Sequence, residues 1–285
     1  MIEGNVTKSV LITGCSSGIG LAVAEGLSAR GWQTFASARQ PEDVEKLNAM
    51  GLNGLLLDVC DSRSIRAAVA EVLDRTNGTL DALCNNAGYG QPGAVEDLSR
   101  EALREQFETN VFGTHELTSL VLPVMRRQRQ GRIVFISSLL GYVALPYRGA
   151  YNASKYALEG LADTLRLELR GTGISVSLIE PGPIRSRFRA NAYLAFQRNI
   201  DPVRSLHAAQ YATMERRFKT KGSVSIFTRG VGTVRAKVVH ALENPHPHAR
   251  YPVTIPAYLF DFLRRFLPGR ALDRILWEVG EAERR

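Results

Sequence analysis

The first two thirds of the chain alternate short apolar runs with longer stretches in which apolar residues recur at helical spacing. This alternation is typical of βαβ units and a parallel sheet, and the consecutive apolar positions within several runs indicate helices on both faces. The pattern predicts strands at residues 9–12, 33–37, 54–57, 82–85, 132–137 and 174–179, and helices that include 18–29, 62–76 and 151–169. We therefore expect an α/β protein with a Rossmann-type, doubly wound parallel sheet. In such sheets, ligands bind beyond the carboxyl ends of the strands, near the reversal of strand order.

The regular alternation fades after Pro181-Gly182-Pro183. Residues 184–230 form a long, basic and weakly periodic region, which we interpret as a lid over the substrate because long excursions are usually functional. The remaining pattern predicts a helix at 231–243, an extended run at 250–255, and a helical stretch at 257–277 that Pro268-Gly269 breaks. We expect residues 1–285 to form a single domain, with residues 256–285 as a C-terminal helical extension that helps to cover the substrate.

With 285 residues and 45% hydrophobic composition, the chain can bury one large core, although its length alone also allows two domains. The cysteines are odd in number, lack C-x-x-C spacing and fall within apolar segments, so we expect reduced thiols at Cys15, Cys60 and Cys84. No basic region precedes the first predicted strand, as a signal peptide would require. The apolar runs are shorter than the roughly 18 residues of a membrane span. These features predict a soluble, cytoplasmic protein.

Positive charge is concentrated in one part of the sequence. Residues 185–237 hold twelve Arg or Lys but only Asp201 and Glu215, a surplus that exceeds the net charge of +8 of the whole chain. Such a field can attract a cofactor phosphate, an acyl-CoA or an acidic membrane surface, although a run of charge is most often a solvated surface. Nucleic acid is not an expected partner, because no recognition motif or aromatic platform accompanies the charge.

A glycine-rich loop, Thr13-Gly14-Cys15-Ser16-Ser17-Gly18-Ile19-Gly20, lies between the first predicted strand and the first predicted helix. Glycines at such a junction let the backbone approach a pyrophosphate at the N-terminus of a helix. The spacing differs by one residue from the G-x-G-x-x-G dinucleotide fingerprint, and a lone glycine cluster could be a tight turn. The flanking strand and helix favour a dinucleotide site with contacts from Gly14, Ser16, Ser17, Gly18, Ile19 and Gly20.

The end of the second predicted strand bears on the choice between NAD and NADP. An NAD site commonly places a carboxylate there, but this chain reads Ala36-Ser37-Ala38-Arg39. Arg39 could pair with the 2′-phosphate of NADP, with Ser37 as a neutral donor, or it could point to solvent. We predict that NADP(H) is preferred over NAD(H). Asp58, which Val59 follows, ends the third strand and could meet the adenine edge or act as a turn carboxylate.

Tyr151 and Lys155 are four residues apart in a predicted helix, and therefore lie on one face of it. An ammonium beside a phenol favours the phenolate and would lower the pKa of Tyr151 from its ordinary value of about 10. Tyr151 could then exchange a proton with a carbonyl or an alcohol. Pairs of this kind are common on helices, so the pair alone is a weak signal.

Four motifs together resemble the short-chain dehydrogenase/reductase family: the glycine loop, Asn85-Asn86-Ala87-Gly88, Tyr151-x-x-x-Lys155 and Pro181-Gly182. The resemblance covers roughly residues 8–188. It implies that Tyr151 is the general acid or base, that Ser138 hydrogen-bonds the substrate oxygen, and that Asn110 supports a proton-relay water near Lys155. Ser137 is a competing candidate, but the distance of Ser138 from Tyr151 along the chain matches the family.

The resemblance also implies the remaining cofactor contacts. Lys155 would hold the hydroxyls of the nicotinamide ribose next to Tyr151. The other implied contacts are Asn86, Ala87 and Gly88 along the cofactor, and Pro181, Gly182, Ile184 and Ser186 near the nicotinamide. The family commonly has Thr where this chain has Ser186, which is a milder hydrogen-bonding replacement.

Within the family, the glycine loop, residues 36–39 and residues 151–160 are similar to the NADP-preferring hydroxysteroid and retinol dehydrogenase branch. This similarity implies a hydrophobic carbonyl or alcohol as the substrate. The family also implies a homodimer or homotetramer, formed through helices near 100–128 and 151–170.

Three further features admit more than one interpretation. His246 and His248 lie in a proline-rich turn but lack the three or four ligands of a zinc site, so no metal is expected. His115 is interpreted as a packed or solvated histidine. The apolar residues of 258–267, with Arg264, Arg265 and Arg270, could dock peripherally on an anionic bilayer. Packing over the substrate pocket or against another subunit is the favoured interpretation, because apolar helix faces usually serve cores and interfaces.

Two classes of function are compatible with these observations. One is a working NADP(H)-dependent oxidoreductase that interconverts a carbonyl and an alcohol. The other is a catalytically silent NADP-binding sensor or scaffold. The joint presence of Asn110, Ser138, Tyr151 and Lys155 favours the enzyme.

Overall fold

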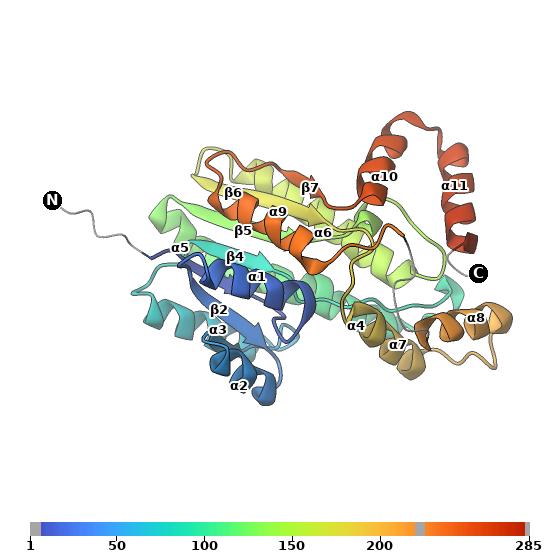
Figure 1. The fold of residues 1–285 in the computed structure, drawn as a ribbon, viewed down its shortest axis with the longest axis horizontal. Helices are drawn as coiled ribbons and strands as arrows, with labels where there is room; N and C mark the ends of the chain where they lie inside the picture. The colour runs from blue at the N-terminus through green and yellow to red at the C-terminus, as the bar shows by residue number, and fades with distance from the viewer. Residues whose placement is uncertain (1–6, 220–225, 283–285) are drawn as a thin grey trace.

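A computed structural model describes residues 7–219 and 226–282 of the protein (Figure 1). A seven-stranded parallel sheet lies at its centre, with the strand order β3-β2-β1-β4-β5-β6-β7. The strands are β1 (Ser9–Ile12), β2 (Gln33–Ala38), β3 (Asn53–Leu56), β4 (Ala82–Asn85), β5 (Gly131–Ile136), β6 (Ile174–Glu180) and β7 (Arg250–Pro252). In this register Leu11 of β1 lies between Phe35 of β2 and Leu83 of β4. The prediction of a doubly wound parallel sheet is confirmed.

Helices cover the sheet and extend beyond its carboxyl edge (Figure 1). The α-helices are α1 (Gly18–Ser28), α2 (Pro41–Ala49), α3 (Ser62–Arg75), α4 (Arg100–Phe107), α5 (Gly113–Gln128), α6 (Gly149–Glu168), α7 (Phe188–Asn199), α8 (Ala208–Lys219), α9 (Val231–Glu243), α10 (Ile255–Phe266) and α11 (Gly269–Ala282). The short helices are η1 (Val95–Asp97), η2 (Glu108–Phe112) and η3 (Leu139–Gly141). Local signals fix several helix starts. Asp61 accepts the N–H of Arg63 at the start of α3, Ser99 accepts that of Ala102 in α4, and Pro41 opens α2.

Two apolar layers hold the helices against the sheet. On one face, α3, α5 and α6 bury residues such as Val69, Val121 and Leu158 against the strands. On the other face, α1, α2 and α9 do the same with residues such as Leu27 and Val238. Successive strand residues face alternate layers, which explains why the strands are apolar at consecutive positions.

The strand order reverses between β1 and β4. The chain leaves β1 toward β2 on one side, and it leaves β4 toward β5 on the other. The loops that follow these two strands are the glycine loop and the segment that begins at Asn86. The topology therefore brings together the two loops that the sequence assigns to the cofactor.

The predicted boundaries agree with the observed ones to within one or two residues in β1 to β6. The sheet has a seventh strand, β7, because the short run near residue 250 pairs with β6. The expectation for the cysteines was wrong in part: the thiols are free, but only Cys84 lies in a strand. Cys15 is buried in the glycine loop and Cys60 is exposed in a turn, because polar turn residues surround it in the sequence.

The region after Gly182 contains more regular structure than its weak periodicity predicts. Two helices, α7 and α8, occupy much of 184–230, and they meet through Phe196 and Tyr211 in a small apolar cluster of their own. Residues 220–225 lie outside the described residues. No helix within the described ranges is long and apolar enough to cross a membrane.

Candidate active site

The glycine loop forms a cradle at the start of α1. Gly14 and Gly18 have φ angles of 71° and 66°, in the left-handed region that favours glycine. A Cβ atom on Gly20 would lie 2.4 Å from the carbonyl oxygen of Gly14, so the helix and loop approach too closely for any other residue. Within the described chain, the side chain of Ser17 makes no capping bond to the first turn of α1. The N–H groups of that turn are therefore available to an anion such as a pyrophosphate.

The loop after β4 is joined to the glycine loop through Thr13. The Thr13 hydroxyl accepts the N–H groups of Asn86 and Ala87, each at 2.9 Å. In return, the Asn86 amide donates to the carbonyls of Thr13 and Gly14, at 2.8 and 3.0 Å. The side chain of Asn86 thus fixes the cradle, which leaves the backbone of residues 86–88 to line a cofactor. Thr13 is a site residue whose role the sequence patterns did not reveal.

The end of β2 presents Arg39 to solvent, whereas Ser37 is fully buried. The Ser37 hydroxyl has no hydrogen-bond partner among the described residues. The structure therefore separates Ser37 from the exposed position at which Arg39 could meet a 2′-phosphate.

Asp58 and Val59 follow β3. One carboxylate oxygen of Asp58 accepts the N–H of Cys60 at 2.9 Å, as in a turn that a carboxylate stabilises. Val59 is buried, and a Cβ atom on Gly113 would lie only 1.8 Å from its carbonyl oxygen. This close approach packs the start of α5 against the end of β3.

Ser138, Tyr151 and Lys155 converge beyond β5 and β6. Ser138 follows β5, where its hydroxyl accepts the N–H of Leu140 at 3.1 Å and lies 3.4 Å from the carbonyl oxygen of Pro181. Tyr151 lies in the first turn of α6. Its pKa is raised to about 12 because burial disfavours the phenolate, and a hydrogen bond from Ser138 and the charge of Arg148 oppose that effect.

Lys155 lies one turn after Tyr151 and is buried. Its ammonium donates to the carbonyl of Ile136 at 2.7 Å and lies 5.7 Å from the centroid of the Tyr151 ring. Burial lowers the pKa of Lys155 to about 8, although the charge of Glu159 acts in the opposite direction.

The expected lowering of the Tyr151 pKa by Lys155 is not observed. The net shift is upward, because burial of the phenol outweighs the favourable interactions with the phenolate. The ammonium is directed to the Ile136 carbonyl instead of the phenol. In this state Tyr151 is a protonated acid at neutral pH.

Asn110 lies in η2, a π-helical turn between α4 and α5, and such turns are frequent at functional sites. Its amide nitrogen donates to the Tyr89 carbonyl and to the Ser154 hydroxyl, each at 3.0 Å. Its amide oxygen accepts the Tyr89 N–H at 3.1 Å. The side chain thus ties the loop after β4 to α6 beside Lys155.

The segment after β6 borders both the catalytic residues and the glycine loop. A Cβ atom on Gly182 would lie 2.1 Å from the Thr254 hydroxyl oxygen, and Ile184 forms a bridge with Arg229. A Cβ atom on Gly18 would lie 3.3 Å from the side chain of Ser186. Ser186 and the N-terminus of α1 are therefore neighbours.

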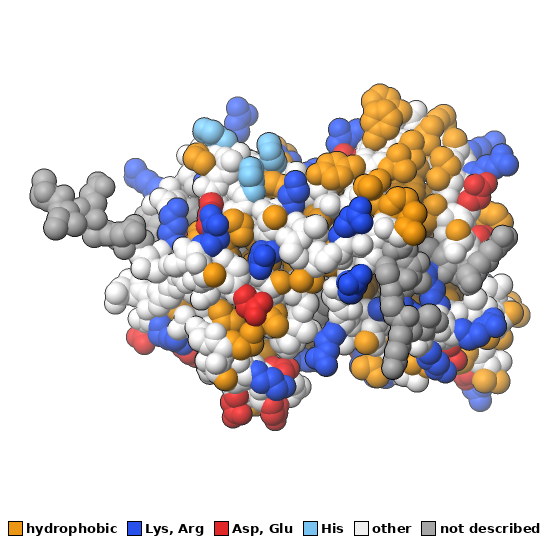
Figure 2. Space-filling model, viewed as in Figure 1, with side chains coloured by type: hydrophobic (Ala, Val, Ile, Leu, Met, Phe, Trp, Pro, Cys, Tyr) orange, Lys and Arg blue, Asp and Glu red, His pale blue; other side chains and the backbone are white. Residues whose placement is uncertain are grey.

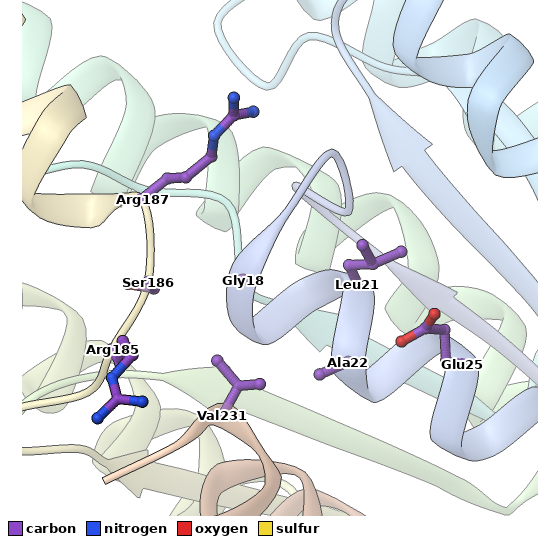
Figure 3. A pocket seen from close by; sticks show the side chains of 8 residues that line it. All are labelled: Gly18, Leu21, Ala22, Glu25, Arg185, Ser186, Arg187 and Val231. Atoms are coloured by element: carbon purple, nitrogen blue, oxygen red, sulfur yellow. The ribbon is translucent and has the colours of Figure 1, made fainter. Parts of the chain in front are cut away.

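A cavity of about 380 Å³ lies at this junction, between α1, residues 185–187 and Val231 at the start of α9 (Figure 3). Figure 3 shows Ser186 close to Gly18, with Arg185 and Arg187 pointing in opposite directions from the chain on either side. The N-terminus of α1 favours an anion here, and the charged residues of the cavity lining are Arg185, Arg187 and Glu25.

Phe188 is a site residue that the sequence analysis missed. Its ring packs edge-on against the ring of Tyr151, with centroids 5.2 Å apart. A Cβ atom on Gly90 would lie 2.8 Å from the same ring, so this glycine makes room for it. Phe188 is 37 positions from Tyr151 along the chain, and no local pattern marks it.

A second group that was missed is a buried ionic cluster beneath α6. Arg250 of β7 forms ion pairs with Glu159 and Asp163 of α6 and with Glu180 at the end of β6. Burial raises the pKa of Glu180 to about 8, with the charge of Glu159 adding to the effect. The only sequence signal was Glu159, four residues after Lys155 and therefore on the same helix face.

Comparison with known proteins agrees with this geometry. Residues 8–195 match the family described as short chain dehydrogenase. The chain belongs to this family. The match spans β1 to β6 and includes the glycine loop, Asn110, Ser138, Tyr151, Lys155 and the beginning of α7.

Three relatives illustrate the range of the family. An oxidoreductase of Escherichia coli K12, named uncharacterized oxidoreductase YbbO, is 44% identical over 94% of both chains. An NADPH-dependent 3-dehydrocapnine reductase of Ornithobacterium rhinotracheale is 31% identical over 95% of this chain and 96% of its own. Human retinol dehydrogenase 8 is 41% identical over 64% of this chain and 60% of its own. The resemblance to the retinol dehydrogenase branch is thus confirmed.

Proposed function

We propose that this short-chain dehydrogenase is an NADP(H)-dependent oxidoreductase that interconverts a hydrophobic ketone or aldehyde with the corresponding alcohol. The observation that carries the proposal is the convergence of Ser138, Tyr151 and Lys155 at the sheet edge where the glycine cradle lies. The glycine cradle follows β1, on one side of the strand-order reversal. Ser138 follows β5, and Tyr151 and Lys155 lie in α6, on the other side. Their meeting brings a proton donor to a dinucleotide site.

The cradle has the features that a dinucleotide requires. Its left-handed glycines and the free N–H groups of α1 suit a pyrophosphate, and the backbone of residues 86–88 would continue the site. One carboxylate oxygen of Asp58 accepts the turn hydrogen bond, and the other would face the adenine. Val59 would pack near the same ring. On the nicotinamide side, Lys155 would hold ribose hydroxyls and residues 181–186 would hold the amide.

Preference for NADP(H) rests on Arg39. It is exposed directly after β2, where a dehydrogenase specific for NAD would present a carboxylate. A guanidinium suits a phosphate through charge-assisted, two-point hydrogen bonds. The NADPH dependence of the O. rhinotracheale relative supports the same preference.

The protein residues divide the proton chemistry between them. Ser138 would donate a hydrogen bond to the substrate oxygen, and Tyr151 would transfer a proton to that oxygen during reduction. The raised pKa of Tyr151 keeps the phenol protonated at neutral pH, as a general acid requires. Lys155, whose ammonium lies 5.7 Å from the centroid of the Tyr151 ring, would stabilise negative charge on the phenolate after the transfer. A bound NADP(H) would supply the hydride, or accept it in the reverse direction.

A hydrophobic substrate is consistent with the groups around Tyr151. Phe188 of α7 and the apolar cluster of η3, α10 and α11 border its ring. In the proposed function, residues 184–230 act as the lid and residues 256–285 as the second wall, both within a single domain. The name of the human relative, a retinol dehydrogenase, supports an apolar alcohol.

The proposal includes a homodimer or homotetramer located in the cytoplasm. Exposed apolar residues on the outer faces of α4 and α6, such as Leu103, Leu161 and Leu167, support association through these helices. The competing function, a silent NADP sensor, would use the cradle alone. The convergence of Ser138, Tyr151 and Lys155 favours catalysis.

The test is oxidation of NADPH in the presence of a panel of hydrophobic ketones and aldehydes. Tyr151→Phe is expected to reduce kcat by about 10²- to 10⁴-fold, because the proton donor is lost, while the Kd for NADPH stays the same. Tyr193→Phe, on α7, is the matched control and should retain activity. NADPH binding without turnover of any substrate, or full activity of Tyr151→Phe, would contradict the proposal.

A further inference from the structure

Glu159 is a buried carboxylate that the proposed proton chemistry does not use. It lies in α6, one turn after Lys155 and two turns after Tyr151, so the three side chains share one region of the helix surface. On the face drawn in Figure 2, lysines and arginines are spread over the surface of the protein. The side chain of Glu159, in contrast, is only 7% exposed. A carboxylate enclosed in this way requires charged or hydrogen-bonding partners.

Arg250 anchors the carboxylate of Glu159 from one side. The two form an ion pair, and Arg250 also pairs with Asp163 at 2.6 Å and with Glu180 at 2.5 Å. Burial raises the pKa of Glu180 to about 8, so Glu180 holds a proton at neutral pH. Burial also raises the pKa of Glu159, but Arg250 opposes that effect. Glu159 is therefore the buried anion that Arg250 fixes in place.

The other side of Glu159 faces the end of β5. Lys155 donates to the carbonyl of Ile136, the last residue of this strand, at 2.7 Å. Glu159 approaches the next residue: a Cβ atom on Gly141 would lie 2.8 Å from the Ser137 hydroxyl oxygen and 3.0 Å from a carboxylate oxygen of Glu159. Lys155 and Glu159 thus reach consecutive residues of the chain, directly before the catalytic serine.

Lys155 is a buried cation beside this carboxylate. Its ammonium is held by the Ile136 carbonyl and lies 5.7 Å from the centroid of the Tyr151 ring. Burial of an ammonium favours the neutral amine, and it lowers the pKa of Lys155 to about 8. The negative charge of Glu159 opposes that effect. Removal of this charge should therefore make the ammonium lose its proton at lower pH.

Other charged or titratable groups face the cluster from α6, β6, α10 and the residue after η3. They are Asp163 and Arg166, Glu180, Asp261 and Arg264, and Tyr142. Asp163 pairs with Arg166 at 3.0 Å, and Asp261 pairs with Arg264 at 3.5 Å. Each of these two carboxylates has a cation on its own helix. For Glu159, the cation on its own helix is Lys155.

We propose that Glu159, held by Arg250, is a positioning residue that keeps the ammonium of Lys155 charged beside Tyr151. Its effect on catalysis rests on the proposed function, in which the ammonium would stabilise the phenolate that remains after Tyr151 gives its proton to the substrate oxygen. Lys155 keeps its own proton throughout this step. The electrostatic coupling of Glu159 to Lys155 does not depend on the proposed function.

Titration of Lys155 in the protein without cofactor or substrate tests the coupling directly. The protein is labelled with carbon-13 at the lysine Cε atoms and titrated by NMR, and Lys155→Met assigns the resonance. Glu159→Gln should lower the titration midpoint of Lys155 by about one pH unit, because a neighbouring opposite charge is lost. Glu180 gains negative charge in this variant and limits the shift, since the charge of Glu159 no longer raises its pKa.

Two further variants of α6 complete this experiment. Asp163→Asn is the matched control, because it also removes a carboxylate that pairs with Arg250, one turn farther along the helix. It should leave the Lys155 midpoint nearly unchanged. Glu159→Asp keeps the charge but draws it back by one methylene, and it should lower the midpoint by less than Glu159→Gln does.

The pH profile of NADPH oxidation with a hydrophobic ketone connects the coupling to catalysis. For reduction, kcat/KM should fall as the pH rises through the Lys155 midpoint, because the ammonium is lost. In Glu159→Gln this fall should occur about one pH unit lower than in the wild type. A purely structural role of Glu159 would instead lower kcat at every pH without moving the profile.

The proposal would be overturned by an unchanged Lys155 midpoint in Glu159→Gln, or by an equal shift in Asp163→Asn. If Glu159→Gln does not fold, an unchanged midpoint in Glu159→Asp would overturn it as well. A shifted midpoint with an unmoved activity profile would overturn the role in catalysis. A shifted midpoint in a protein that turns over no substrate would contradict the proposed function and still support the coupling of Glu159 to Lys155.

Discussion

The cofactor loops after β1 and β4 and the catalytic segments after β5 and β6 lie at one edge of the sheet, but they are held in different ways. The cofactor side is shaped by backbone: left-handed glycines, and the hydrogen bonds that join Thr13 to Asn86. The catalytic side is shaped by buried charge. Lys155 is buried and donates to the Ile136 carbonyl, and Arg250 forms ion pairs with the buried carboxylates of Glu159 and Glu180. Backbone geometry can be specified by local sequence, whereas a buried charge requires partners from distant parts of the chain.

The largest effect should come from removing the cation beneath α6. Arg250→Met leaves Glu159 and Glu180 buried without their partner, and breaking such a cluster costs about 3–5 kcal/mol. Denaturant unfolding should therefore show a large loss of stability. Arg30→Met removes an exposed pair with Glu243 and should change stability by less than about 1 kcal/mol. Equal losses of stability in the two variants would show that the buried ion pairs of Arg250 contribute no more than the exposed pair of Arg30.

Arg39→Ala should produce the next largest effect, on the cofactor side. Loss of a charge-assisted contact with the 2′-phosphate should raise the Kd for NADPH by about 10- to 100-fold and leave the Kd for NADH nearly unchanged. Calorimetric titration with both cofactors measures the two values. Arg127→Ala, an exposed arginine on α5, is the control. An equal loss of affinity for NADPH and NADH would show that Arg39 does not bind the 2′-phosphate.

The pH dependence of stability sharpens the contrast further. Burial lowers the pKa of Lys155 from 10.5 to about 8, so between these values the unfolded chain binds a proton that the folded protein does not. Stability attributable to Lys155 must therefore increase as the pH rises through this window. Relative to Lys155→Met, the wild type should gain about 2 kcal/mol between pH 8 and 10. A constant difference between the two proteins would show that the Lys155 pKa is not lowered.

The smallest predicted effect concerns the lid. Phe188→Ala removes the ring that packs on Tyr151 and should raise KM for a hydrophobic ketone by about three- to tenfold, which corresponds to the modest free energy of an aromatic pair. The Kd for NADPH should not change. Leu194→Ala, on the same helix but 63% exposed, is the control. Loss of cofactor affinity in Phe188→Ala would show that the lid contributes to cofactor binding.

The sequence was most informative where one short segment determines both structure and chemistry. The strands, the glycine loop, and the Tyr151 and Lys155 pair could be predicted because their spacing is local. Phe188 and Arg250 could not, because their contacts with Tyr151 and Glu159 depend on how α7 and β7 fold back. The direction of the Tyr151 pKa was also mispredicted, since proximity to Lys155 is visible in sequence but burial of the phenol is not.

The position of Arg250 in the last strand has a consequence for the growing chain. During synthesis from the N-terminus, the segments that carry Tyr151, Lys155, Glu159 and Glu180 emerge from the ribosome before β7 does. Until then, β6 is an open edge of the sheet and its carboxylate lacks a cation. The catalytic side is therefore completed only when β7 has been synthesised. Nascent chains and C-terminal truncations that end before Arg250 should accordingly be substrates for quality-control proteases rather than active enzymes.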